Sequence, residues 1–444
     1  MELREIDNKV LIKSKFKLPY GTNLGSKWGF KLSNSTTKDK KFNKHLPIIL
    51  LIMFTETLGF SIVLPVLPHL GLSLGLNFFQ IGLISSIFSF CQLFASPITG
   101  KLSDRFGRKP ILIFSQSSTF LGFLLLGMVD TVWILILARL VDGLLGSNMT
   151  VTQAYLSDVT DPKDRTKTFG YSSAVFGAAL IFGPVIGGTL SSINYSIPMF
   201  FAAGISLISI ILVIIFLQES LTIKKEKFNL KFEEIIPIKE TKRFFKSTEI
   251  KGLLIIFFIY NFAFMIFISS FALLAKIQLD VNSQELGFYL AWVGILRVIF
   301  QSALITPLLK KINENNTLKI GVLALVITMI SLVLITNFWI VFIPLIFLAF
   351  GSGVVRPILT SKLSKSVGKE ETGSLLGVNN SFSSIAQILS PILGGLILEF
   401  LPSQTLPAIS AVLFLLIFVF WRFGFTKPIQ VEATSPVKYE KKNL

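Results

Sequence analysis

The chain has 444 residues, of which 52% are hydrophobic and only 15% are charged. Soluble domains carry about 25% charged residues, so this composition excludes an ordinary soluble protein. Two histidines and one cysteine exclude a disulfide framework and a metal site built from these residues, and we expect no metal and no cofactor. The net charge of +17 on so hydrophobic a chain indicates contact with a membrane.

Apolar runs of about 20 residues, the length that crosses a bilayer as a helix, occur twelve times in the chain. Because no alternating strand pattern is present, a membrane β-barrel is excluded. The sequence therefore predicts an all-α membrane protein with twelve transmembrane helices. The runs cover 46–70, 78–100, 110–129, 132–156, 168–191, 197–217, 251–274, 286–309, 317–336, 338–361, 372–398 and 403–424.

Charged segments divide these runs into two groups of six. We expect a basic N-terminal tail over 1–45, a six-helix bundle over 46–217, a linker over 218–250, a second six-helix bundle over 251–425 and a C-terminal tail over 426–444. If the N-terminus is cytoplasmic, the inside segments collect 38 of the 42 Lys and Arg residues. The positive-inside rule therefore places both termini in the cytoplasm, in a multi-pass protein of the cell membrane. The basic residues are spread over one membrane face, which argues against a nucleic-acid partner.

The two groups of six resemble each other. GPVIGG at 183–188 matches SPILGG at 390–395 with an offset of 207, and the Leu-Ser pair at 156–157 matches 363–364 with the same offset. Six-helix repeats of the same orientation are parallel repeats, as in one large transporter fold. We therefore expect two parallel six-helix repeats.

Three further segments carry a resemblance to a known family. GKLSDRFGRKP at 100–110, LILARLVDGLLG at 135–146 and GAALIFGPVIGG at 177–188 resemble motifs of the major facilitator superfamily, and together they are similar to its twelve-helix drug:proton antiporter group, near the tetracycline and multidrug exporters. The resemblance covers about 46–425. It implies the major facilitator fold and the export of a small molecule in exchange for protons.

The loop at 100–110 has two interpretations. Its cations anchor the helix ends at the cytoplasmic face, and an anchor alone would explain them. An aspartate adds nothing to such an anchor, and the resemblance implies that Asp104 faces the start of a helix near Thr372 and closes a cytoplasmic gate. The residues that we assign to this gate are Gly100, Asp104, Arg105, Gly107 and Arg108.

The glycine-rich run at 177–188 also has two interpretations. Small residues four apart let another helix approach closely, and the proline bends its own helix, so packing alone explains the pattern. The resemblance adds that a tight seam prevents proton leakage in an antiporter. The residues of this antiporter motif are Gly177, Gly183, Pro184, Gly187 and Gly188.

Three ionisable residues lie within apolar runs of the first half. Each costs at least ~2.5 kcal/mol at a helix centre, so such residues mark functional sites. Glu56 lies in the first run, and Arg139 and Asp142 lie three residues apart on one face of the fourth. A carboxyl group buried in a membrane can bind and release a proton, and a neighbouring arginine adjusts that equilibrium. We expect Glu56, Arg139 and Asp142 to couple transport to protons, with a permanent Arg139–Asp142 pair as the alternative.

The second half offers residues for substrate binding. Arg297 and Arg356 have no acidic residue in their own apolar runs, although Arg356 is near enough to the cytoplasmic side to be an anchor. Three asparagines can line a cavity or simply bond between helices. The candidates are Asn261, Arg297, Arg356, Asn379 and Asn380.

The sequence thus predicts a secondary active transporter and not an enzyme. We expect it to act as a monomer in the lipid bilayer and to export a small lipophilic molecule, with cations as candidates, in exchange for protons. A proton-linked importer or organic-anion carrier of the same fold is the alternative, because of the arginines in the second half. A non-transporting membrane sensor ranks last.

Overall fold

The structure is a computed structural model that describes residues 37–161, 164–221 and 237–422. Within these residues the chain forms helices joined by short connections, with no strand. Both predicted tails, apart from 37–45, and residues 222–236 of the predicted linker lie outside the described residues.

The first half contains seven helices that make six spans. The first helix begins at Thr37, before the predicted boundary at 46, and α4 and α5 together form the fourth span. The helices are α1 (Thr37–Ser73), α2 (Phe78–Phe106), α3 (Arg108–Gly127), α4 (Val132–Leu145), α5 (Asn148–Val159), α6 (Arg165–Ser191) and α7 (Ser196–Phe216).

The second half begins with the short helix α9, and its second span is divided into an α-helix, a π-helical turn and a further α-helix. The sequence predicted that span, 286–309, as one helix. The elements are α9 (Ile238–Phe244), α10 (Thr248–Leu279), α11 (Ser283–Ile299), η1 (Phe300–Leu304), α12 (Ile305–Ile312), α13 (Glu314–Leu334), α14 (Phe342–Lys365), α15 (Lys369–Phe400) and α16 (Thr405–Arg422).

Eleven spans of the described chain are long and apolar enough to cross a membrane, and the apolar part of α16, Thr405–Trp421, is somewhat shorter. Large apolar side chains such as Trp133, Leu334 and Phe400 are exposed on the helices, as lipid-facing residues are. The prediction of an all-α membrane protein with twelve transmembrane helices is confirmed.

Matching caps show that the second span of each half begins in the same way. Asn77 accepts a hydrogen bond from the backbone of Gln80, at 2.8 Å, and the Gln80 side chain accepts one from the backbone of Asn77, at 3.0 Å. Asn282 and Glu285 repeat this reciprocal pair at the start of α11, with both bonds at 2.9 Å. Such capping boxes satisfy N–H groups that a helix start leaves free.

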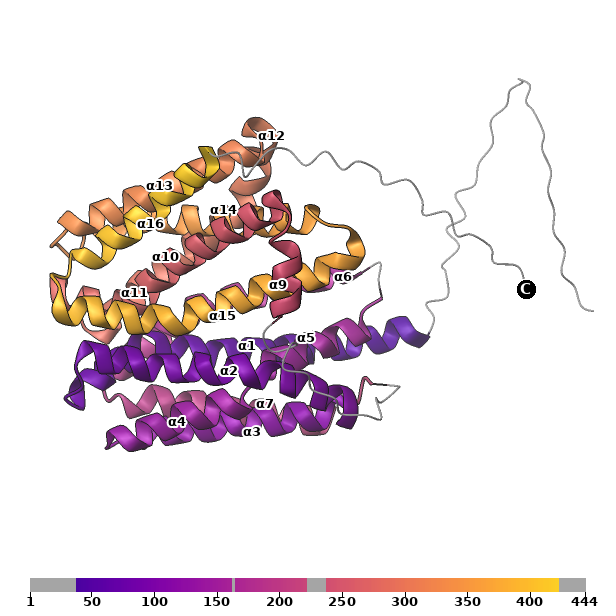
Figure 1. Cartoon of the computed structure of the whole chain (residues 1–444). Helices are drawn as coiled ribbons and strands as arrows, with labels where there is room; N and C mark the ends of the chain where they lie inside the picture. Colours follow the sequence, from indigo (N-terminus) through magenta and orange to yellow (C-terminus); the bar gives the residue numbers. More distant parts are fainter. Residues whose placement is uncertain (1–36, 162–163, 222–236, 423–444) are drawn as a thin grey trace, which may run out of the picture. The chain divides into compact units, whose positions relative to one another are not determined.

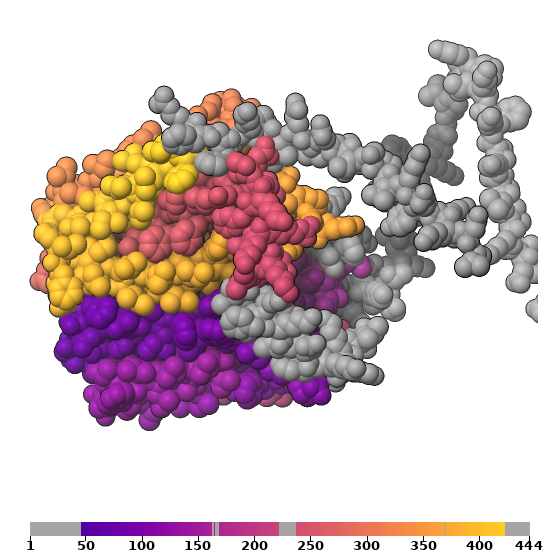
Figure 2. Space-filling model, viewed as in Figure 1, coloured from indigo at the N-terminus to yellow at the C-terminus, as the bar shows by residue number. Residues whose placement is uncertain are grey.

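Each half is a bundle, and the two bundles meet through two helix pairs. In the first half α3 packs on α7 and α4, and in the second half α13 packs on α14 and α16. Between the halves α2 packs along α15, and α6 packs along α11 (Figure 1). The space-filling view shows the first half in indigo and magenta, meeting the yellow and orange second half along one boundary (Figure 2).

Glycines bring the backbones together in both of these pairs. A Cβ atom on Gly287 of α11 would overlap the carbonyl oxygen of Pro184 on α6, and one on Gly82 of α2 would overlap that of Pro391 on α15. Pro184 and Pro391 are equivalent in the sequence repeat. We name these two contacts, α6–α11 and α2–α15, the paired seams.

Close contacts between the halves are found at one end of the helices. We call the end that carries the loop 101–109 the basic end, and the other the opposite end. At the opposite end three hydrogen-bond contacts cross between the halves. They join His69 Nε2 to the Val281 carbonyl at 3.2 Å, the Phe78 N–H to Glu399 Oε2 at 2.9 Å, and Ser86 Oγ to the Ile388 carbonyl at 2.7 Å.

Near the basic end α6 and α15 each have open space beside a glycine. Gly170 on α6 and Gly377 on α15, which match each other in the repeat, have space beside them: a Cβ atom on either would meet nothing within 4 Å. Gly188 and Gly395, farther along the same helices, are tightly enclosed by the other half. The paired seams therefore join the halves toward the opposite end.

This arrangement predicts the effect of a single methyl group. Gly188→Ala should destabilise the state with the opposite end closed, because its Cβ would press on the Ser283 backbone of α11. Overpacking costs about 1–3 kcal/mol, a shift of roughly 5- to 150-fold in the populations. Distances between spin labels at Asn194 and Gln404, in a Cys91→Ser background, should lengthen in Gly188→Ala. Gly204→Ala, where the added methyl meets nothing within 4 Å, is the control. Unchanged distances in Gly188→Ala would show that the seam does not limit closure.

Candidate functional site

Glu56 lies in α1 at the centre of a polar cluster in the first half. The residue is half-buried, and its Oε2 atom is fully buried without a hydrogen-bond partner in the protein. The backbone N–H of Met149, at the start of α5, lies within hydrogen-bonding reach of this carboxyl group. The group therefore sits beside the positive end of a helix, although no basic side chain neutralises it.

Arg139 and Asp142 are both almost fully buried in α4, at 5% and 6% exposure. The Arg139 guanidinium lies over the ring of Phe88, with its Cζ 4.6 Å from the ring centroid, and its Nε has no hydrogen-bond partner. In the described chain no carboxylate lies within 4.0 Å of it, Asp142 included. This geometry argues against a permanent Arg139–Asp142 pair.

Asp142 belongs to a different set of contacts. The Thr119 hydroxyl of α3 bonds to its carboxyl group, and Thr119 Oγ1 accepts a hydrogen bond of 2.9 Å from Asn148 Nδ2. Asp142 and Glu56 are near enough for their charges to act on each other. The structure thus brings the three predicted coupling residues into one cluster, but it distributes their contacts over α1, α3, α4 and α5.

The fourth span is broken beside this cluster, whereas the sequence predicted one helix over 132–156. The first part of the span ends at Leu145 and the second begins at Asn148, so Gly146 and Ser147 interrupt the helix. Gln92 Nε2 of α2 donates to the freed carbonyl of Gly146 at 2.8 Å. The interruption directs the N-terminus of α5 toward Glu56.

Unpaired polar atoms surround the interruption. Ser147 Oγ and Asn148 Oδ1 are fully buried without hydrogen-bond partners in the protein, like Glu56 Oε2 and Arg139 Nε. Buried polar atoms are nearly always bonded, and those without a protein partner bind water or a ligand. The cluster can therefore take up protons or polar groups of a ligand.

Four residues of this cluster were missed by the sequence analysis. A Gly-Ser-Asn run inside an apolar segment is a signal for a helix break and a new N-terminus, so Asn148 could have been found. The other three, Phe88, Gln92 and Thr119, have no local signal that distinguishes them from ordinary helix residues.

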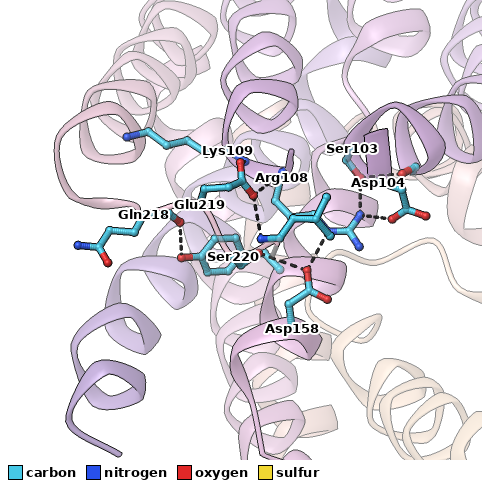
Figure 3. A network of polar contacts seen from close by, with 11 residues as sticks. Ser103, Asp104, Arg108, Lys109, Asp158, Gln218, Glu219 and Ser220 are labelled. Carbon is cyan, nitrogen blue, oxygen red and sulfur yellow. Dashed lines mark hydrogen bonds and ion pairs between the residues drawn. The ribbon is translucent and has the colours of Figure 1, made fainter. Parts of the chain in front are cut away.

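A second polar network lies at the basic end, around the predicted gate (Figure 3). Arg108 is buried and donates from Nη1 to Asp104 Oδ1 at 2.7 Å and to Ser103 Oγ at 2.6 Å. Its Nε donates to Asp158 Oδ2, at the end of α5, at 2.9 Å. Arg108 thus links α2, α3 and α5 within the first half. Of the other gate residues, Gly100 approaches Thr150, and the exposed Arg105 lies over the Phe106 ring.

Glu219, which follows α7, binds the start of α3. Its carboxylate accepts the backbone N–H of Arg108 at 2.8 Å and that of Lys109 at 3.1 Å, groups that a helix start leaves free. Gly107 makes this approach possible, because its φ of 113° suits glycine and a Cβ atom there would overlap Glu219 Oε2. No local signal in the sequence pointed to Glu219, since its partner lies more than 100 residues earlier.

The second half has the equivalent contact with the charges reversed. Lys365, which matches Asp158 in the repeat, donates to Glu314 Oε1 at 2.6 Å, at the start of α13. Lys362 donates to Asn315, which matches Arg108, at 2.5 Å. Equivalent helix ends are therefore joined by ion pairs in both halves, with the basic residue on the start of α3 in the first half and on the end of α14 in the second.

The antiporter-motif residues lie along α6. Gly183 and Gly187 face Ser61 and Ile62 of α1, and the Ser61 hydroxyl donates to the Ala179 carbonyl at 2.8 Å. Pro184 and Gly188 form the α6–α11 seam, and Gly177 faces Val298 of α11. One face of α6 in this motif thus packs on α1 of the first half, and the adjacent face packs on α11 of the second half.

The five substrate-binding candidates do not form one group. Asn261 and Asn379 are buried, and the Asn261 Nδ2 has no protein partner, while Asn380 is exposed. Arg297 is half-buried and Arg356 is exposed. In the described residues no cluster of three His, Cys, Asp or Glu side chains is suited to a metal ion.

Comparison with known proteins identifies the family. The model of the Major Facilitator Superfamily matches residues 49–391. The chain belongs to this superfamily. It is a family of membrane transporters, and the fold predicted from the sequence is that of its members.

Similar sequences come from bacteria. The tetracycline resistance protein of class H from Pasteurella multocida is 34% identical over 361 residues, which are 79% of this chain and 88% of that protein. Class E from Escherichia coli is 30% identical over 82% of this chain and 89% of its own length. Multidrug resistance protein 2 of Bacillus subtilis is 28% identical over 81% of this chain and 91% of its own length.

Solved structures agree on the fold. A point mutant of the nucleoside transporter NupG matches with a TM-score of 0.73 at 13% identity, over 86% of this chain and all of that one. The human organic anion transporter MFSD10 matches with a TM-score of 0.65 at 20% identity, over 85% of this chain and 99% of that one. At these identities the likeness is one of fold.

The network at the basic end predicts a difference between neighbouring arginines. Arg108→Gln should lower stability by about 1.5–3 kcal/mol, because it removes the ion pairs of the buried Arg108 with Asp104 and Asp158. Arg105→Gln, in the same loop but exposed, should change stability by less than about 0.5 kcal/mol. Thermal unfolding of the purified proteins in detergent measures both. Equal melting temperatures for the two variants would mean that Arg108 does not hold this corner together.

Proposed function

We propose that the chain exports a small lipophilic molecule in exchange for protons, by alternating access of a central site to the two sides of the membrane. The observation that carries the proposal is the cluster of Glu56, Asp142 and Arg139 inside the first bundle. Ionisable groups at that depth are costly and mark proton and substrate pathways. The names of the similar sequences, tetracycline and multidrug resistance proteins, support export as the direction.

Glu56 is the proton carrier in this proposal. Its buried Oε2 has no partner, so a proton can bind there without breaking a hydrogen bond. When the group is ionised, the N-terminus of α5 and the Met149 N–H stabilise its charge. Arg139 is free of a carboxylate partner and can respond to whichever charge arrives nearby, a proton or a substrate. Asp142 is the second carboxylate and shares the charge balance with Glu56.

Alternating access follows from the paired seams. We place the basic end in the cytoplasm, with both termini, in the cell membrane, because Lys and Arg gather in its loops. The structure then corresponds to an inward-facing state, with the outer side closed by the seams. The loop with Asp104 and Arg108 acts as the inner gate. A monomer suffices, because the site and both gates belong to one chain, which acts as a transporter and not as an enzyme.

The proposal predicts how Glu56→Gln behaves. The amide keeps the size of the side chain but cannot release a proton. Accumulation of tetracycline into proteoliposomes with an acidic interior should fall to the level of protein-free liposomes. Exchange of labelled for unlabelled tetracycline, which needs no net proton movement, should persist.

Two variants control this experiment. Glu249→Gln removes an exposed carboxylate at the start of α10 and should retain full accumulation. Asp142→Asn tests the second carboxylate in the same assay. Gradient-driven accumulation that survives in both Glu56→Gln and Asp142→Asn would overturn the proton-exchange mechanism.

A further inference from the structure

Two arginines, the half-buried Arg297 and the exposed Arg356, lie near each other in the second half. Arg297 lies fourteen residues beyond the start of α11, and Arg356 lies fourteen residues beyond the start of α14. The two helices cross at Gly353, one turn before Arg356, where a Cβ atom would lie 3.5 Å from Arg297 Cγ. Both side chains therefore lie at a similar depth in the second bundle.

Tyr260 completes the group from a third helix, α10. Its side chain is 2% exposed, and its hydroxyl is near enough to both arginines for their charges to act on it. The charges of Arg297 and Arg356 also act on each other. We name Tyr260, Arg297 and Arg356 the arginine cluster.

Among the described residues no acidic side chain neutralises these charges. In the described residues no Asp or Glu lies within 4.0 Å of either guanidinium, and neither donates to a protein hydrogen bond that the structure records. The acidic residues of α10 and α11, Glu249 and Glu285, lie in the first turns of their helices. The second bundle thus holds two unneutralised cations where the first holds two carboxylates.

Membrane anchoring does not explain the pair. Arg356 is nine residues before the end of α14, about 14 Å along the helix, and Arg297 is farther from the basic end along its own span. Arginine anchors lie close to the helix ends, where the guanidinium reaches the interface. Two like charges near each other disfavour each other, and an anion bound between them offsets this cost.

The backbone beside Arg297 is irregular. The π-helical turn η1, Phe300–Leu304, begins three residues after it, and the side chains from Gln301 to Leu304 are exposed. Single π-helical turns inside helices occur frequently at functional sites. This feature is independent of the charges and marks the same part of the second bundle.

We propose that the arginine cluster binds an anionic oxygen group of the transported molecule, a carboxylate or an acidic enol. The guanidinium groups donate parallel hydrogen bonds that match such a group, and the Tyr260 hydroxyl adds a further donor. With the carboxylates of the first half facing a cationic group, the substrate class is an amphiphile that carries both charges. The assignment of a substrate rests on the proposed export function, whereas binding of the anion does not.

Two fluorescent dyes test the proposal. Rhodamine 110 carries a free carboxylate, and rhodamine 123 is its methyl ester, so the pair differs in one negative charge. The purified full chain in phosphatidylcholine nanodiscs should bind the carboxylate dye more tightly than the ester, as measured by fluorescence anisotropy. Arg297→Gln and Arg356→Gln should each weaken binding of the carboxylate dye by about 10-fold, the effect of one charge-assisted hydrogen bond, and leave the ester within about twofold.

Further variants separate charge from folding. Arg297→Lys keeps the charge but loses the planar fork, and it should fall between the wild type and Arg297→Gln. Lys310→Gln removes an exposed cation of α12 and should bind both dyes as the wild type does. Retained ester binding shows that each variant is folded.

Each of the following results would overturn the proposal. The wild-type protein does not bind the carboxylate dye more tightly than the ester, or does not bind it at all. Arg297→Gln weakens the binding of both dyes equally. The wild-type protein no longer distinguishes the two dyes when the nanodiscs contain phosphatidylglycerol. The last result would assign the cluster to an anionic lipid headgroup.

The test is independent of proton coupling. Glu56→Gln should keep the difference between the two dyes, because Glu56 lies in the other half. If the dyes are distinguished but both Glu56→Gln and Asp142→Asn still drive uphill transport, only the proposed proton exchange fails. If Glu56→Gln loses uphill transport but the arginine variants do not distinguish the dyes, only the anion site fails.

Discussion

The cost of an unneutralised charge inside an apolar bundle is the constraint on which this molecule depends. At the basic end the buried arginine of the gate network is paired: Arg108 binds Asp104 and Asp158, and Glu219 binds a helix start. Inside the bundles Glu56 and Arg139 have no ionic partner among the residues that the structure describes. A charge at that depth is retained where a proton or substrate completes it.

The sequence repeat distributes this constraint unequally. Both halves use the same capping box and the same proline-glycine seam, so the scaffold is nearly duplicated. The interiors differ, because the first half carries carboxylates beside a broken helix and the second carries arginines beside a π-helical turn. A duplicated scaffold whose first half holds two carboxylates and one arginine, and whose second half holds two arginines, is suited to a ligand that differs at its two ends.

Patterns that repeat along the chain were predictable, whereas contacts between distant segments were not. Apolar runs and loop charges predicted twelve spans, and the depth of Glu56, Arg139 and Asp142 within their runs singled them out. The helix break at Gly146 and Ser147 was not predicted, because the apolar run around it is continuous in hydropathy. Glu219 and Thr119 have no local signal, since a tertiary contact alone gives each its role. Seam closure at one end is likewise a property of packing.

The central claim is that substrate and a proton compete for the cluster around Glu56. Proton release on substrate binding tests it most directly, because it needs no membrane gradient. Addition of tetracycline to the purified protein, in weakly buffered detergent solution with a pH indicator, should release up to about one proton per chain. Glu56→Gln should release none. Equal proton release from the wild type and Glu56→Gln would contradict the claim.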